Sequence, residues 1–139
     1  MAQPRIGQKV VVDVPATTAN LGPGFDCLGA ALDLNNRFAM RRIEGGGERF
    51  ELIIEGTEGS HLRGGPENLV YRAAQRVWKA AGLEPVALEA RVRLAVPPAR
   101  GLGSSATAIV AGLMGANALV GEPLSKEKLL ELAIDIEGH

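Results

Sequence analysis

Short runs of β-compatible residues fill most of the first 55 positions of the chain. Their apolar and polar residues predict strands at residues 9–14, 27–34, 37–43 and 50–55. Pro15 is predicted to end the first run, and the pair Asn35-Asn36 to separate the second from the third. The glycines at 45–47 precede the fourth run and predict a hairpin turn into it. These segments favour a mixed or antiparallel sheet.

A helical period follows, in which apolar residues recur at every third or fourth position. It predicts one helix from Pro66 to Gly82, a second that opens after the glycine-rich stretch and closes at Gly121, and a third near the C-terminal end. Residues 86–96 lie between the first two helices and alternate apolar with charged side chains, which predicts a strand with one solvated face. Together these elements indicate an α/β or α+β domain.

The composition narrows the functional classes. With 139 residues, 46% of them hydrophobic, the chain suits one domain with its own core. Fifteen basic residues against 16 acidic ones leave no electrostatic signal for nucleic acid. The single cysteine, Cys27, excludes an intramolecular disulfide and favours a reducing compartment. The N-terminal apolar run is short and is interrupted by Asp13, so it matches neither a signal peptide nor a membrane span. We therefore expect a soluble cytoplasmic protein.

Residues 96–107, VPPARGLGSSAT, join the last predicted strand to the second helix. Successive glycines let several backbone N–H groups point into one concavity, and the start of a helix adds free N–H groups and a positive dipole end. An anion such as phosphate is the natural occupant. The hydroxyls of Ser104 and Ser105 suit a phosphate oxygen and a magnesium ion. The plain alternative is that these serines only cap a helix after a glycine turn.

Other phosphate loops fit this stretch poorly. A Walker loop needs a lysine that is missing here. Gly101, Gly103 and Ala106 match the dinucleotide fingerprint in form, but residues 97–100 separate the strand from the glycines, and the segment after the helix is a further helix. The glycine loop of protein kinases joins two strands and is followed by a lysine, and neither feature is predicted here.

The loop 15–26 and Glu131 each have a structural and a functional interpretation, whereas Asn68 has only a structural one at this point. The loop 15–26, PATTANLGPGFD, is rich in turn-forming residues, yet Asn20 and Asp26 on it suit the orientation of a small polar substrate. Asn68 at the start of the first helix is typical of local backbone bonding. Glu131 lies on the polar face of the last helix, where a carboxylate either meets solvent or lines a cleft and holds a metal ion.

Residues 97–106, PPARGLGSSA, resemble the ATP-binding signature of the GHMP small-molecule kinases. The loop 15–26 is similar to the N-terminal motif of one member of that family. The resemblance implies an α+β fold of the ribosomal protein S5 domain 2-like type, a mixed sheet with helices on one side. It also implies that residues 1–139 form the N-terminal ATP-binding domain, with the C-terminal domain absent and apolar surface exposed where it would pack.

The resemblance implies roles for particular residues. Asn68 would face the adenine of ATP, and Asn20, Asp26 and His139 would contact the substrate. Ser105 and Glu131 would hold Mg²⁺ and act as the catalytic pair. The cradle for the nucleotide phosphates would comprise Pro97, Pro98, Ala99, Arg100, Gly101, Leu102, Gly103, Ser104, Ser105, Ala106 and Thr107.

The implied reaction transfers the γ-phosphoryl group of ATP to the hydroxyl of L-homoserine, a step of threonine biosynthesis. Mg²⁺ would assist, no nucleic acid or membrane would take part, and the full-length enzyme would form a homodimer. We expect the 139 residues alone to be inactive or weakly active. Two alternatives stay open at this point, namely a nucleotide- or anion-binding fragment without catalysis, and another small-molecule kinase of the same family.

Overall fold

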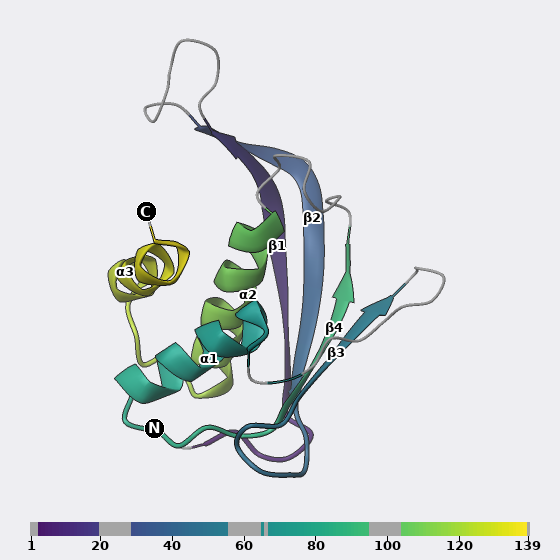
Figure 1. Ribbon diagram of the computed structural model, residues 1–139, viewed down its shortest axis with the longest axis vertical. Helices are drawn as coiled ribbons and strands as arrows, with labels where there is room; N and C mark the ends of the chain where they lie inside the picture. The colour runs from purple at the N-terminus through teal and green to yellow at the C-terminus, as the bar shows by residue number, and fades with distance from the viewer. Residues whose placement is uncertain (1–2, 20–28, 56–64, 66, 95–103, 139) are drawn as a thin grey trace.

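Four strands form one sheet, and three helices cover one of its faces (Figure 1). The computed structural model describes residues 3–19, 29–55, 65, 67–94 and 104–138. The strands are β1 (Lys9–Ala19), β2 (Gly29–Arg42), β3 (Phe50–Glu55) and β4 (Leu88–Arg93). The helices are α1 (Leu69–Ala80), α2 (Ser104–Leu119) and α3 (Lys126–Glu137). This arrangement confirms the expected α+β class with a mixed sheet and helices on one side.

The strands lie in the order β1-β2-β4-β3. The β1–β2 and β2–β4 pairs are antiparallel, whereas β3 and β4 run parallel and are joined through α1. The predicted hairpin at residues 45–47 is therefore wrong, because β4 lies between β2 and β3. Instead, Gly47 packs against the segment before β4, where a Cβ on Gly47 would lie 2.7 Å from the carbonyl oxygen of Pro85.

Two predicted strand breaks are also wrong. Pro15 does not end β1, since the strand passes an irregularity between Pro15 and Thr17 and continues to Ala19. A bulge at the edge of the described sheet tolerates a residue without an N–H group. Asn35 and Asn36 lie inside one continuous β2, paired with Pro15 and Val14. The amide of Asn36 is buried there and is bonded to a helix, which explains how it fits into a strand.

The core lies between the sheet and the two helices α1 and α2. Tyr71 of α1 stacks on Phe50 of β3 at 5.1 Å between ring centroids and meets the edge of Trp78 at 6.0 Å. Burial raises the pKa of Tyr71 to about 12, and the charge of Glu48 adds to the shift. Gly112 brings the backbones of α1 and α2 together, since a Cβ there would lie 2.7 Å from the Cβ of Ala73.

Helix α2 is the central helix of this layer. Its 16 residues include no charged side chain, as expected for a helix covered on several sides. It packs against β1, α1 and α3, and close contact with Met40 of β2 occurs at Gly115. None of the helices in the described part of the chain is long and apolar enough to span a membrane.

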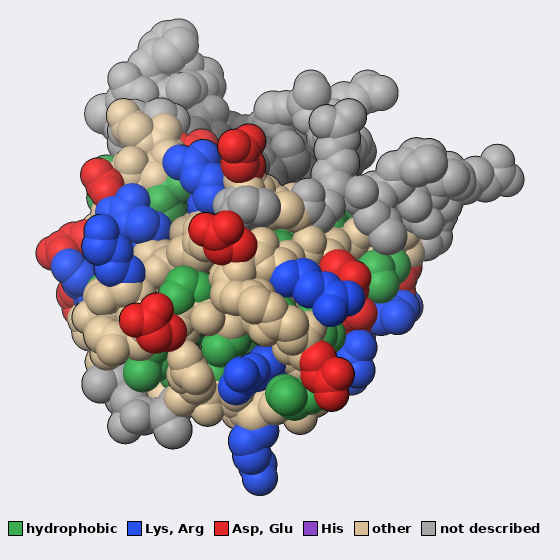
Figure 2. Space-filling view, turned by 60° about the horizontal axis from the view of Figure 1, so that its bottom comes forward, with side chains coloured by type: hydrophobic (Ala, Val, Ile, Leu, Met, Phe, Trp, Pro, Cys, Tyr) green, Lys and Arg blue, Asp and Glu red, His purple; other side chains and the backbone are tan. Residues whose placement is uncertain are grey.

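The opposite face of the sheet carries charged side chains of both signs. Arg37 donates to Asp13 at 2.8 Å, and this hydrogen bond lowers the pKa of the Asp13 carboxyl. Glu89 lies between Arg41 and Arg91, at 3.3 Å from each. Acidic and basic side chains are also interspersed over the surface shown in Figure 2. The solvated face predicted for residues 86–96 is confirmed in β4 at Arg91 and Arg93, which are exposed, whereas Glu89 on the same face is buried beneath Arg41 and Arg91.

Candidate phosphate site at the start of helix α2

The first turn of α2 lies where the sequence predicts a phosphate cradle. The helix begins at Ser104, and the first N–H groups of a helix have no partner within the helix. These groups and the helix dipole favour an anion. The predicted cradle residues 97–103 lie outside the described residues, as do the side chains of Ser104 and Ser105. Of the predicted set, Ala106 is half-buried and Thr107 is buried.

A buried hydrogen bond ties this turn to the sheet. Nδ2 of Asn36 in β2 donates to Oγ1 of Thr107 at 3.0 Å, and the two residues are only 1% and 2% exposed. The motif resemblance implies that Thr107 belongs to the phosphate site, whereas the local sequence predicts that Asn36 lies at the boundary between two strands. The sequence signal for the role of Asn36 is a polar amide flanked by residues that favour strands. A buried amide needs a hydrogen-bond partner, so such a residue points to a contact with another element.

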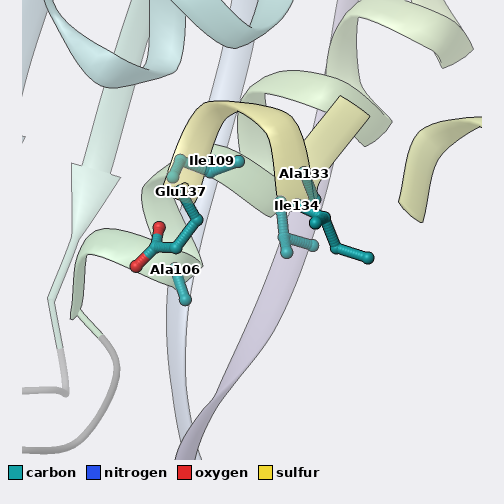
Figure 3. A pocket seen from close by; sticks show the side chains of 6 residues that line it. Ala106, Ile109, Ala133, Ile134 and Glu137 are labelled. Atoms are coloured by element: carbon teal, nitrogen blue, oxygen red, sulfur yellow. The ribbon is translucent and has the colours of Figure 1, made fainter. Parts of the chain in front are cut away.

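A pocket lies between the start of α2 and the end of α3. Figure 3 shows the carboxylate of Glu137 pointing from α3 toward the first turn of α2, near Ala106. Glu137 is the charged member of the described lining, and the other described lining residues are apolar. The lining comprises Ala106, Ile109, Val110, Ala133, Ile134 and Glu137.

Glu131, which the sequence analysis selected, has different surroundings. Its side chain is 71% exposed and lies 3.6 Å from Lys128, and it is absent from the described lining of the pocket. Glu137 lies six positions after Glu131, which places the two about 120° apart around α3. Asp135, on the same helix, forms an ion pair with Arg76 of α1. The structure thus brings Glu137, rather than Glu131, to the start of α2.

The signal for Glu137 was present in the sequence. It follows Ala133 by four residues and Ile134 by three, and side chains at these spacings are neighbours on a helix surface. Apolar Leu129, Leu132, Ala133 and Ile136 recur at helical spacing, so the carboxylate of Glu137 lies beside the apolar side of the helix. Glu137 lies at the border between the polar and apolar faces of α3, so a search of the polar face alone misses it.

Asn68 is the N-cap of α1, where its Oδ1 accepts from the N–H of Val70 at 2.9 Å. This confirms the local backbone role that the sequence indicates for it. The predicted substrate residues Asn20, Asp26 and His139 lie outside the described residues.

The pocket residues are compatible with a magnesium ion that also binds nucleotide phosphates. Within the described residues, no group of three or more His, Cys, Asp and Glu side chains forms a metal cluster. Magnesium commonly takes one or two protein oxygens and completes its shell with phosphate and water oxygens. One carboxylate, that of Glu137, beside a helix start that favours phosphate fits this pattern.

Apolar side chains are exposed beside this site. Met114 on α2 is 47% exposed, and Leu130 and Ile134 on α3 are 61% and 50% exposed. Met114 and Leu130 line a second hollow between the two helices, which shares Val110 and Ala133 with the pocket at Glu137.

Comparison with known proteins identifies the family. Residues 68–139, just over half of the chain, match the family described as GHMP kinases N terminal domain. The chain belongs to the GHMP kinase family. The matched region includes α1, β4, α2 and α3, and therefore both sides of the pocket that holds Glu137.

Relatives of this GHMP kinase chain are longer proteins. The homoserine kinase of Synechococcus sp. (strain CC9605) is 99% identical over all 139 residues, which span 44% of its length. The crystal structure of homoserine kinase from Cytophaga hutchinsonii superposes with a TM-score of 0.77 at 28% identity, over 99% of this chain and 43% of that one. The structure of a putative homoserine kinase from Listeria monocytogenes superposes with a TM-score of 0.68 at 39% identity, over 95% of this chain and 44% of that one.

Proposed function

We propose that this GHMP kinase chain forms the ATP-binding part of a homoserine kinase, which phosphorylates the hydroxyl of L-homoserine. The observation that carries the proposal is the 99% identity to the Synechococcus homoserine kinase over every residue of the chain. Identity this high extends through both sequence motifs, 15–26 and 97–106, and through the pocket between α2 and α3. The product is O-phospho-L-homoserine, in threonine biosynthesis.

In this reaction the homoserine oxygen forms a bond to the γ-phosphorus of ATP, and the bond between that phosphorus and the bridging oxygen breaks to release ADP. The hydroxyl proton passes to solvent. Phosphoryl transfer of this kind depends mostly on positioning and on neutralising the charge of the transferred group. The N–H groups at the start of α2 and the glycine-rich residues 97–103 would supply both to the phosphates.

Glu137 and the hydroxyl of Ser105 would hold Mg²⁺ at this end of α2. The ion neutralises phosphate charge when bound. The carboxylate of Glu137 in the pocket beside Ala106 supports its role, and the start of α2 at Ser104 supports that of Ser105. We therefore assign to Glu137 the part that the motif comparison suggested for Glu131, whose described partner is Lys128 on the solvent side of α3.

The remaining roles follow from the motifs alone. Asn68 would face the adenine from the N-terminal end of α1, while Asn20, Asp26 and His139 would contact homoserine, with Asp26 binding its ammonium group. The protein would act in the cytoplasm as a homodimer without nucleic acid or membrane. The single cysteine and the net charge of −1 support the cytoplasmic setting and argue against a nucleic-acid partner.

The test uses a hybrid protein in which these 139 residues replace the matching segment of the Synechococcus homoserine kinase. ADP release is measured with homoserine, mevalonate, galactose and shikimate, with and without Mg²⁺. We expect turnover that requires both homoserine and Mg²⁺, and little or none from the 139 residues alone. ATP binding without turnover on any substrate would instead support the noncatalytic alternative, and preference for another alcohol would support another kinase of the family.

A further inference from the structure

The hydrogen bond between Asn36 and Thr107 joins two segments that are 71 positions apart in the sequence. It lies in the core, at the end of α2 where we propose that the phosphates bind. Both side chains are almost fully buried. Among the described side chains, α2 also meets the sheet through apolar contacts, such as Met40 against Gly115.

Stability alone gives little reason for a polar pair at this place. Two apolar residues of similar shape can replace a buried hydrogen-bonded pair at almost no cost. A hydrogen bond, however, constrains both a distance and an angle, which apolar contacts do not. The pair therefore restricts the rotation of α2 about its axis and its sliding along β2 at one defined turn.

That turn is the first of α2. Thr107 directly follows Ala106, which lines the pocket together with Glu137. At a helix radius of about 2.3 Å, a rotation of roughly 20° moves backbone groups by nearly 1 Å. Displacements of about 1 Å from a remote change can lower the rate on the order of 100-fold.

We propose that Asn36 is a positioning residue for the nucleotide site: by holding the hydroxyl of Thr107, it sets the direction of the free N–H groups at the start of α2. The inference rests on the proposed function, because it requires phosphate at this end of the helix. Asn36 acts through Thr107 and the helix backbone. The competing explanation is that the pair only stabilises the core.

Three variants of the hybrid protein separate these explanations: Asn36→Leu, Thr107→Val and the two combined. Each single change removes the hydrogen bond between the two buried side chains and should lower the melting temperature. The double change removes both polar groups, so stability returns toward that of the parent. If the pair positions the helix, the double variant still binds MgATP about tenfold more weakly, measured by calorimetry well below the melting temperature.

Two further variants complete the design. Thr107→Ser keeps the hydroxyl and should recover affinity relative to Thr107→Val. Leu119→Ala removes buried apolar atoms at the far end of α2 and should lower the melting temperature without weakening MgATP binding. A double variant that binds MgATP as tightly as the parent would overturn the inference. Absence of MgATP binding by the parent hybrid would contradict the proposed function itself.

Discussion

Helices α1 and α3 both have 12 residues and both lie against α2, yet they are held very differently. Six residues of α1 are buried, including Tyr71 and Trp78, whereas α3 buries Leu132 alone. Leu130 and Ile134 of α3 are at least half exposed. The comparison shows that α1 forms part of the core, while α3 is a lightly packed helix that carries the carboxylate of the proposed site.

Polar contacts fix the connection that leads into α3. The amide of Asn117 in α2 binds both the N–H and the carbonyl oxygen of Leu124, each at 3.0 Å, and so fixes the connection that leads into α3. Ser125 caps the helix at the N–H of Lys128. These contacts act together with the apolar packing of Leu132, and of Leu129, Ala133 and Ile136 against the core, to position Glu137 relative to α2. The exposed Arg76–Asp135 ion pair adds a weaker contact to α1.

The largest expected effect is on α1. Trp78→Ala removes a fully buried ring from the core and should lower the free energy of unfolding by about 4 kcal/mol, measured by urea denaturation. Leu130→Ala on α3 is the matched change of an exposed apolar residue and should alter it by less than about 0.5 kcal/mol. Similar losses in the two variants would contradict the difference between the helices.

The second-largest loss of unfolding free energy is expected where α1 and α2 are in close contact. Gly112→Ala places a methyl group against the backbone of Val70 and the side chain of Ala73, so it should cost about 2 kcal/mol of unfolding free energy. Gly46→Ala is the control, because nothing lies within 4 Å of a Cβ at that position. If both variants unfold at the same urea concentration, α1 and α2 are less tightly packed than we describe.

The pH dependence of stability tests the burial of Tyr71. The pKa of Tyr71 is raised from 10.0 to about 12 in the folded protein. The stabilisation linked to its neutral hydroxyl is therefore complete below pH 10 and is lost as the pH rises toward 12. By pH 11 the loss should reach about 1 kcal/mol of unfolding free energy. Tyr71→Phe should remove this part of the alkaline decline. An unchanged decline in the phenylalanine variant would show that other groups cause it.

The smallest effect concerns the ion pair between α1 and α3. Both Arg76 and Asp135 are substantially exposed, so a double-mutant cycle with Arg76→Ala and Asp135→Ala should give a coupling of less than about 1 kcal/mol. Added salt should reduce it further. A coupling several times larger would mean that α3 is held more firmly than its single buried residue suggests.

Local chemistry was readable from the sequence. The start of α2 at Ser104 follows from the serines after the glycines, and Gly121, with a φ of +88°, follows the helix as predicted. Alternation in β4 also predicted its two faces, since buried Leu88 and Ala90 alternate with charged residues. Each of these features depends on neighbours within a few residues.

The arrangement of distant segments was not readable in this way. The glycines at 45–47 predict a hairpin by their local chemistry, but β4 pairs with both β2 and β3 and lies between them. The roles of Asn36 and Glu137 depend on helices that pack against them from elsewhere in the chain. Periodicity identifies the faces of an element but not the element that will cover each face.

We propose that Glu137 on the lightly packed helix α3, rather than Glu131, completes a magnesium and phosphate site at the start of α2. The most direct test measures how homoserine phosphorylation by the hybrid protein depends on Mg²⁺ concentration in Glu137→Gln and Glu131→Gln. We predict that Glu137→Gln raises the Mg²⁺ concentration for half-maximal rate by at least about tenfold, whereas Glu131→Gln leaves it near the parent value. Equal shifts in the two variants, or a larger shift for Glu131→Gln, would contradict the claim.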